Sequence, residues 1–297
     1  MSRLVLPLAT LRIDTLIAAG SLWDSCGRLA QADELYTLAL DAFSSGLHSC
    51  EDLDLLDLTE VGRIAERCGR PAEAIRCYRY LLEMETDRLG SEAPELATAH
   101  RNLAAKFLEN DETEAAYSHL QRALVLGQRV TGFEDPANAP LYCELGLLAI
   151  VLDRFTEAAE FLEQALECQW KSETPSIVEL IVIYEYLGHV YFQMENLDEA
   201  VVLFEERVRL VEILYGKGEP ETARAYLALA ECRLLMGRLT DAHELFSAAL
   251  AIYSKQPSSE TLQCARIREF LLQREDPTGL EQTGAINSSG DNVPGCG

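Results

Sequence analysis

Apolar residues in the stretch 186–204 follow the spacing of two consecutive helices. The polar pair Glu195-Asn196 separates two apolar stripes whose gaps of three and four residues are those of a helix face. The stripes consist of Leu187, Val190 and Tyr191 before the pair, and Leu197, Ala200, Val201 and Phe204 after it. This pattern predicts an antiparallel helical hairpin. A glycine inside a helix costs about 1 kcal/mol relative to alanine, so Gly188 predicts close approach of the second helix at Ala200.

The same unit recurs every 42 residues along the chain. The alanine at position 200 recurs as Ala32, Ala74, Ala116, Ala158 and Ala242. The position of Gly188 holds Gly20, Gly62, Ala104, Gly146 and Ala230, and that of Phe204 holds Tyr36, Tyr78, Leu120, Leu162 and Phe246. The position of Glu195 holds Gly27, Gly69, Asp111, Asp153 and Gly237, residue types that end helices or cap the next one. A constant period over six registers predicts a repeat array.

Leu187-Gly188 with Ala200 and Phe204, and Gly20 with Ala32 and Tyr36, resemble the motif of the tetratricopeptide repeat family. The family's usual period is about 34 residues, so each hairpin here is longer by roughly one turn per helix. Such extended repeats are similar to those of kinesin light chains and their bacterial relatives. The junctions between repeats carry the related pattern Leu89-Gly90…Pro94…Ala97, Thr131-Gly132…Pro136…Ala139 and Tyr215-Gly216…Pro220…Ala223. The resemblance implies an all-α, right-handed α-solenoid of six antiparallel helical hairpins.

The expected organisation has four parts. Residues 1–9 read as a lead-in to the first helix, and residues 10–255 contain the six repeats. Residues 256–274 form one more amphipathic helix, which suits the polar cap that the end of a solenoid needs. Residues 275–297 are rich in Gly, Ser, Asn and Asp, a composition that predicts a disordered tail.

The composition limits which binding partners and which cellular compartment can be expected. The net charge is −24, from 49 acidic and 25 basic residues, which disfavours binding to nucleic acid and to an anionic membrane surface. No apolar run approaches the roughly 18 residues of a membrane span. The nine cysteines include no CxxC pair and fall mostly in helical stripes. We therefore expect a soluble, cytoplasmic protein.

The chain lacks the motifs that carry chemistry. It has no Walker loop, no GxSxG sequence and no HExxH or similarly spaced metal ligands among its five histidines. His100 shares the register of Tyr142, Tyr184 and Tyr226, which favours a packing role. We expect no catalytic residues, no metal and no cofactor, and an enzyme is the least favoured class.

In the resembled family, the first helix of each hairpin lines a concave groove where partners bind. Carried over by register, this groove contains Arg63, Arg67, Arg101, Cys143, Leu147, Ile150, Val151, Glu185, His189, Phe192, Arg224, Leu227, Glu231 and Leu234. Arginine can hold a carboxylate through two parallel hydrogen bonds, so the first three residues suggest a peptide with an acidic group and large apolar anchors. In the alternative interpretation, these arginines pair with neighbouring carboxylates such as Glu66 or Glu109.

Together these features predict a noncatalytic scaffold or adaptor that binds a peptide or protein segment in the groove. The alternative is a chaperone-like or regulatory protein that holds a basic partner through its acidic surface. Salt separates the two, because an acidic-surface complex weakens steeply as ionic strength rises.

Overall fold

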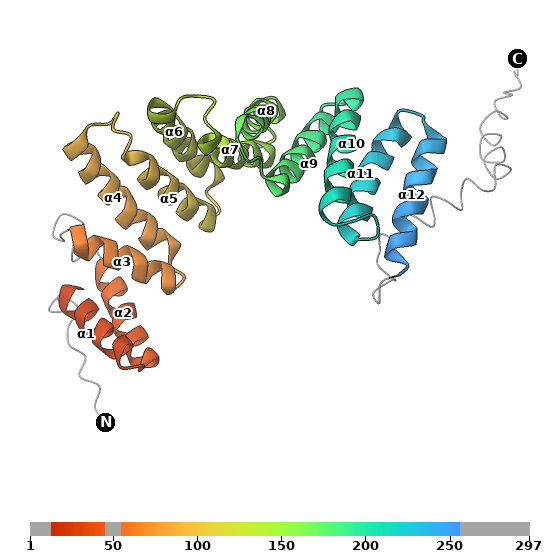
Figure 1. Cartoon of the computed structure of the whole chain (residues 1–297). Coiled ribbons are helices and arrows are strands. Elements are labelled where there is room, and N and C mark those ends of the chain that lie inside the picture. Colours follow the sequence, from red (N-terminus) through yellow and green to blue (C-terminus); the bar gives the residue numbers. More distant parts are fainter. Residues whose placement is uncertain (1–12, 45–54, 256–297) are drawn as a thin grey trace, which may run out of the picture. The chain divides into compact units, whose positions relative to one another are not determined.

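A computed structural model describes residues 13–44 and 55–255, without the side chains of residues 55–57. This part of the chain contains twelve α-helices, one short 3₁₀ helix and no strand (Figure 1). The helices are α1 Ile13–Ser25, α2 Leu29–Ser44, α3 Leu55–Arg67, α4 Pro71–Leu89, α5 Leu96–Glu109, α6 Thr113–Thr131, η3 Pro136–Asn138, α7 Ala139–Val151, α8 Phe155–Lys171, α9 Ile177–Gln193, α10 Leu197–Leu214, α11 Pro220–Leu235 and α12 Leu239–Tyr253. Each odd-numbered α-helix pairs with the next, as the hairpin pattern predicts.

The fold is therefore the predicted all-α solenoid of paired helices, and its right-handed sense stays a prediction. The chain divides into two compact units, residues 1–173 and 174–297. Unit 1 contains α1 to α8, and unit 2 contains α9 to α12. The predicted lead-in (1–9), capping helix (256–274) and tail (275–297) lie outside the described residues.

The break between the two helices of each hairpin has one backbone conformation in all six repeats. A residue with positive φ stands there each time. The residues and angles are Gly27 (72°), Gly69 (65°), Asp111 (60°), Asp153 (57°), Glu195 (61°) and Gly237 (75°). This left-handed conformation is the common way to end a helix. Three repeats adopt it without glycine, so local helix termination here does not depend on glycine alone.

Gly188 makes room for a ring rather than for the backbone of the second helix. A Cβ atom at this position would lie 2.7 Å from Cε1 of Phe204. The sequence predicted that the second helix approaches Gly188 at Ala200. That prediction was wrong, because the residue that fills the space is Phe204. Gly20 has the same relationship to Tyr36, at 2.5 Å, and Gly146 to Leu162, at 2.7 Å. In each case, the large residue follows the glycine by sixteen positions and fills the space of the absent side chain.

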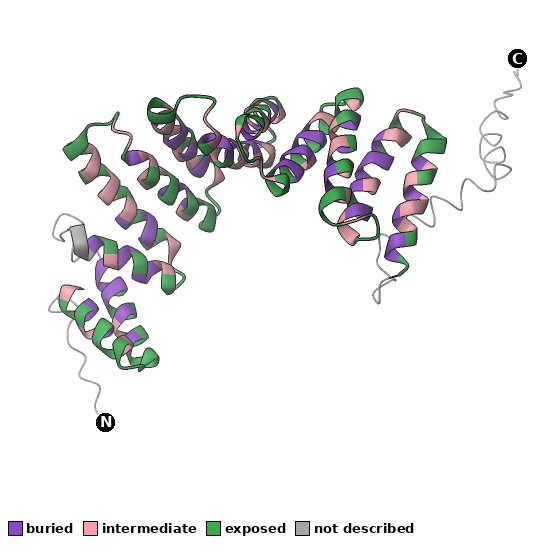
Figure 2. Cartoon of the chain, viewed as in Figure 1, coloured by how far each residue is buried: buried purple, intermediate pink, exposed green. Residues whose placement is uncertain are grey.

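The repeated alanine forms the centre of each hairpin. The residues at this register are all 0% exposed, namely Ala32, Ala74, Ala116, Ala158, Ala200 and Ala242. Figure 2 shows that buried positions form stripes on the helices, which leave the opposite sides to solvent. The apolar positions spaced by three and four residues in the sequence thus form the buried face of each helix.

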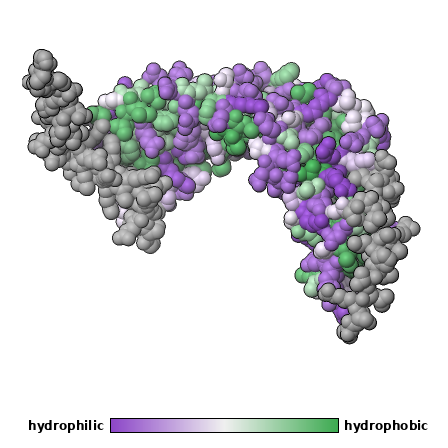
Figure 3. Space-filling model, turned by 180° about the vertical axis from the view of Figure 1, so that it is seen from behind, coloured by the Kyte–Doolittle hydropathy of each residue, from purple (hydrophilic) through white to green (hydrophobic). Residues whose placement is uncertain are grey.

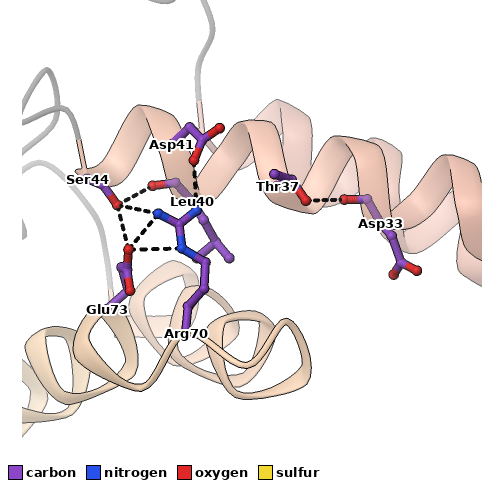
Figure 4. A network of polar contacts seen from close by, with 7 residues as sticks. All are labelled: Asp33, Thr37, Leu40, Asp41, Ser44, Arg70 and Glu73. Atoms are coloured by element: carbon purple, nitrogen blue, oxygen red, sulfur yellow. Dashed lines mark hydrogen bonds and ion pairs between the residues drawn. The ribbon is translucent and has the colours of Figure 1, made fainter. Parts of the chain in front are cut away.

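A polar network joins the first repeat to the second (Figure 4). Arg70, just before α4, lies between α2 and the first turn of α4. Its Nη1 donates to Asp41 at 2.7 Å, its Nη2 to Ser44 at 3.1 Å, and its Nε to Glu73 at 2.9 Å. Ser44 also donates to Glu73 at 3.0 Å. One guanidinium therefore fixes the start of the second helix of a repeat against the preceding repeat.

Candidate functional site

The residues expected to line the groove lie on the first helices of five hairpins, divided between the two units. The unit 1 face consists of Arg63 and Arg67 on α3, Arg101 on α5, and Cys143, Leu147, Ile150 and Val151 on α7. The unit 2 face consists of Glu185, His189 and Phe192 on α9, and Arg224, Leu227, Glu231 and Leu234 on α11.

Two arginines of the unit 1 face lie on α3. Arg63 is 66% exposed and bonds to Glu60 within the same helix at 2.8 Å. Arg67 is 44% exposed and bonds to Asp24 on α1 at 2.6 Å. The guanidinium of Arg67 also lies 4.6 Å from the centroid of the Tyr36 ring. The hydrogen bond to Asp24 raises the pKa of Arg67, opposed by partial burial. Both side chains stay accessible at an open cavity of about 370 Å³, which Arg63, Ile64, Glu66 and Arg67 line.

Arg101 links two successive repeats. Its Nε donates to Glu144 on α7 at 3.3 Å, and its Nη2 donates to the other oxygen of the same carboxylate. The side chain of Arg101 is 51% exposed. The carboxylates expected as its partners are held elsewhere, since Lys106 binds both Glu66 (3.0 Å) and Glu109 (2.7 Å). Internal pairing of the groove arginines is thus present in the structure, with different carboxylates from those expected.

The apolar part of the unit 1 face follows directly on α7. Val151 is 67% exposed, and Leu147 and Ile150 are half-buried. Glu144, which holds Arg101, lies one helical turn before Leu147. The guanidinium of Arg101 is thus bound at the helix that carries these aliphatic side chains, and the two together match a peptide with an acidic and an apolar residue.

The unit 2 face has a different charge arrangement. Arg224 bonds to Glu221 within α11 at 2.9 Å. Glu185 binds Arg207, a residue of α10, at 2.9 Å. The His189 ring packs edge-on against Phe204, with centroids 5.2 Å apart. Phe192, Leu227 and Leu234 are half-buried, and Glu231 is exposed. Figure 3 shows hydrophobic residues exposed among hydrophilic ones over the visible surface.

Sequence reasoning missed Arg207. Its guanidinium is buried, at 5% residue exposure, in a register where most repeats hold alanine. A comparison of this register across the repeats would have found it, because Arg207 is the one charged residue among alanines and a leucine.

A histidine pair was also missed. Nδ1 of His100 on α5 lies 2.9 Å from Nδ1 of His119 on α6, and the His119 ring stacks on Phe107. Burial lowers the pKa of His100 to about 4, helped by the neighbouring His119 and Arg122. The packing role expected for His100 agrees with this geometry. In the fourth repeat the register of His100 holds Tyr142, whose hydroxyl reaches Gln128 at 2.7 Å.

The histidine is shorter than that tyrosine, and an open cavity of about 470 Å³ lies beside it. The cavity is lined by Leu82, Glu83, Thr86, Asp87, Ser91, His100 and Arg122. Thr86 precedes His100 by fourteen residues, as Gln128 precedes Tyr142. The register that holds a tyrosine in the fourth repeat thus borders an open cavity in the third.

Comparison with known proteins identifies the class. Residues 139–168 and 179–255 match the tetratricopeptide repeat family. Protein KINESIN LIGHT CHAIN-RELATED 1 of Arabidopsis thaliana is 23% identical over 207 residues, which cover 69% of this chain and 33% of the relative. This chain therefore spans about a third of the length of that relative. The chain carries tetratricopeptide repeats, as the sequence motif indicated.

Solved structures agree on the fold. A Podosopora anserina protein described as a kinesin light chain with nearly identical TPR-like repeats is 24% identical, covers 69% of this chain and 97% of its own, and has a TM-score of 0.55. YrrB, a TPR protein described as having an unusual peptide-binding site, is 16% identical, covers 79% of this chain and 97% of its own, and has a TM-score of 0.51. Both show the same solenoid architecture.

Two further observations concern the described residues only. None of their helices combines the length and apolar character needed to cross a bilayer. Nor do they bring three or more His, Cys, Asp or Glu side chains together in a group that could hold a metal ion.

Tetratricopeptide repeats generally mediate protein–protein interactions and are generally noncatalytic.

Proposed function

We propose that this chain is a noncatalytic, cytoplasmic scaffold or adaptor whose unit 1 face binds a peptide or protein segment. The bound segment carries a carboxylate for the arginines of α3 and α5 and an apolar side chain for α7. The chain needs no cofactor, and it binds neither nucleic acid nor a membrane. The observation that carries the proposal is the exposed, two-bond fork of Arg101 on Glu144 of α7, the helix that also carries Leu147 and Val151.

The internal ion pairs of the three arginines are compatible with this role. Exposed ion pairs contribute only about 0–1 kcal/mol each, so a partner's carboxylate can replace the internal one at small cost. The internal carboxylates meanwhile hold each guanidinium in place, which reduces the entropy lost on binding. Affinity then comes mainly from the apolar anchor, while the arginines select the charge and position of the segment.

The class of protein supports the same interpretation. Tetratricopeptide repeats are interaction modules, and YrrB, which shares the fold, is described as having a peptide-binding site. The unit 1 face is proposed from the exposure and chemistry of its own residues.

The test is affinity capture from lysate with three forms of the chain, each at low and moderate salt. The first is the wild type. The second carries Arg63→Glu, Arg67→Glu and Arg101→Glu. The third is a control with the same change in charge on second helices, Arg88→Glu, Arg129→Glu and Lys171→Glu on α4, α6 and α8. Circular dichroism confirms that all three are folded.

The proposal predicts a partner that survives moderate salt, is retained by the control variant and is lost from the unit 1 face variant. Partners that remain on the unit 1 face variant and wash off in salt would contradict it. That result would favour the alternative, in which the acidic surface of a chain with net charge −24 holds a basic partner.

A further inference from the structure

In two repeats, a tyrosine on the first helix binds the second helix of the preceding repeat. The hydroxyl of Tyr142 on α7 donates to the carbonyl oxygen of Phe133 at 3.2 Å and accepts from Nε2 of Gln128 on α6 at 2.7 Å. The hydroxyl of Tyr226 on α11 donates to Oε1 of Glu212 on α10 at 2.6 Å. In both cases the partner side chain stands fourteen residues before the tyrosine. The tyrosine hydroxyl therefore joins successive repeats at this register.

The third repeat has different residues at all three positions of the contact seen in the fourth. His100, Thr86 and Ser91 replace the tyrosine, the glutamine and the phenylalanine, each 42 residues earlier in the chain. Oγ1 of Thr86 donates to the carbonyl oxygen of Leu82 in its own helix at 2.6 Å, and the ring of His100 faces His119. These two side chains thus make other contacts than their counterparts in the fourth repeat.

All three of these residues line the open cavity of about 470 Å³ beside His100. Arg122 on α6 also lines it, and its Nη2 donates to the carbonyl oxygen of Ser91 at 2.5 Å. That carbonyl is the counterpart of the one that accepts from the tyrosine hydroxyl in the fourth repeat. The positions that bind a tyrosine hydroxyl in one repeat therefore line an open cavity in another.

The cavity can hold an aromatic ring. An apolar cavity of about 150 Å³ is already large enough for benzene, so the volume suffices. Leu82 gives the cavity an aliphatic wall and His100 an aromatic one. The centroid of the His100 ring lies 5.1 Å from that of His119, which stacks on Phe107 at 5.3 Å. A further ring beside His100 would extend this group, and aromatic pairs are favourable beyond the area that they bury.

The polar lining favours a neutral group that carries a hydroxyl. The carboxylates of Glu83 and Asp87 repel an anion, while the guanidinium of Arg122 repels a cation. Arg122 is also already paired with Glu92 at 2.7 Å. A carbonyl oxygen has two lone pairs, so that of Ser91 can accept from a phenol as well as from Arg122. A phenol combines the ring and the hydroxyl that this lining suits.

We infer that this cavity is a phenol subsite, which takes the ring of a partner's tyrosine or of a free phenol. The ring lies beside His100, and its hydroxyl donates to the carbonyl oxygen of Ser91 next to Thr86. The third repeat thus takes from another molecule the group that the fourth repeat supplies from its own chain.

The subsite is separate from the unit 1 face. Its lining comes from the second helices α4 and α6, the junction between α4 and α5, and His100 on α5. None of its lining residues belongs to the predicted groove. The inference rests on the proposed function only where the phenol is a partner's tyrosine, and a small phenol tests the subsite without any partner.

The experiment is a titration of the full chain with p-cresol, followed through the ring ¹H–¹³C resonances of its histidines. The five histidine signals are assigned by single substitutions. Toluene is the probe of similar shape without the hydroxyl. N-acetyl-tyrosinamide presents the same phenol on a peptide backbone and so represents the tyrosine of a protein. Saturation-transfer NMR of each probe gives its dissociation constant.

Two variants test the location of the subsite. His100→Tyr with Thr86→Gln reproduces the tyrosine and glutamine of the fourth repeat, so that the chain's own ring should occupy the cavity. The matched control is His243→Tyr on α12, a register that holds Tyr117 in the third repeat. Circular dichroism confirms that both variants are folded.

We expect a saturable shift of the His100 resonance with p-cresol in the wild type and in His243→Tyr, and no binding by the double variant. Toluene should bind several-fold more weakly, because a site that bonds a hydroxyl discriminates against the analogue without it. Binding of N-acetyl-tyrosinamide as well would make a partner's tyrosine the source, and binding of p-cresol without it would make the source a free phenol.

No saturable shift of the His100 resonance in the wild type would overturn the inference. So would equal affinities for p-cresol and toluene, or undiminished binding of p-cresol by the folded double variant. None of these results bears on partner capture by the unit 1 face.

Discussion

The ring of Phe204 occupies the space in which Gly188 lacks a side chain, with Cε1 2.7 Å from the position of a Cβ atom. Gly188→Ala should therefore destabilise unit 2 even though alanine favours helix. Overpacking costs about 1–3 kcal/mol, against a gain of about 1 kcal/mol in helix propensity. Urea unfolding measures the difference.

A matched double variant separates packing from propensity. Gly188→Ala with Phe204→Leu reproduces the pair Ala104 and Leu120 of the third repeat. The two changes should be non-additive, so that the double variant is more stable than the sum of the single variants predicts. Additive losses would show that the ring and the glycine are not coupled.

Glu195 adopts a φ of 61°, a conformation that suits glycine better than any residue with a Cβ atom. Glu195→Gly should stabilise the chain by about 0.5–1 kcal/mol, since left-handed backbone costs an L-residue roughly 1–2 kcal/mol. The converse change, Gly237→Ala at a φ of 75° in the sixth repeat, should destabilise it. Thermal unfolding of the two variants measures both changes in stability. A loss of stability in Glu195→Gly would contradict the prediction.

The pair His100 and His119 should make unit 1 sensitive to acid. Burial lowers the pKa of both histidines, that of His100 to about 4 from an ordinary 6.5. A histidine with a lowered folded pKa is neutral in the fold and takes up protons on unfolding. Stability is therefore full above pH 6.5 and falls as pH drops towards 4.

At pH 5, this effect should amount to about 1–2 kcal/mol, after allowance for partial exposure. The control is the double variant His100→Phe, His119→Phe, which retains the other titrating groups. Urea unfolding at pH 7 and pH 5 should show a larger loss for the wild type than for the control. Equal losses would mean that the pair does not titrate in this range.

Exchanging the charges of Arg101 and Glu144 separates internal pairing from partner binding. Arg101→Glu alone breaks the bridge between α5 and α7 and should cost at most about 1 kcal/mol, because the pair is exposed. Arg101→Glu with Glu144→Arg restores an ion pair across the same helices and should recover that stability. Partner capture should stay impaired in the double variant, since the guanidinium has moved to another helix. Recovery of both properties would assign the pair a structural role only.

Most of the fold could be predicted from the sequence, because the same hairpin pattern occurs in it six times. One hairpin supplied the pattern, and the constant register of Ala200 and Glu195 placed the helix breaks in the others. The residue predicted to contact Gly188 was wrong, because periodicity gives the face of a helix but not the side chain that fills the space on it. The boundary between the two units, after residue 173, falls in the link 170–176, which departs from the junction pattern of the other repeats, but that departure alone did not predict a division.

The site was less accessible to sequence reasoning. The register placed the groove residues on the first helices, but it could not say which carboxylate each arginine meets. Arg101 pairs with Glu144, 43 residues further along the chain, and Lys106 takes the carboxylate of Glu66. Such choices depend on side-chain reach between neighbouring helices. Arg207 was missed for a different reason, since it lies on a second helix and the family resemblance places the groove on the first helices.

The most direct test of the central claim is photo-crosslinking in cells from two matched positions. A photoreactive residue replaces Val151 of the unit 1 face in one variant and Val130 of α6 in the other. The two valines are 67% and 68% exposed, so they differ in face and not in access to solvent. Binding by the unit 1 face predicts a discrete partner crosslinked at Val151, lost on Arg101→Glu, and none at Val130. The same partner crosslinked equally at both positions, or only at Val130, would contradict it.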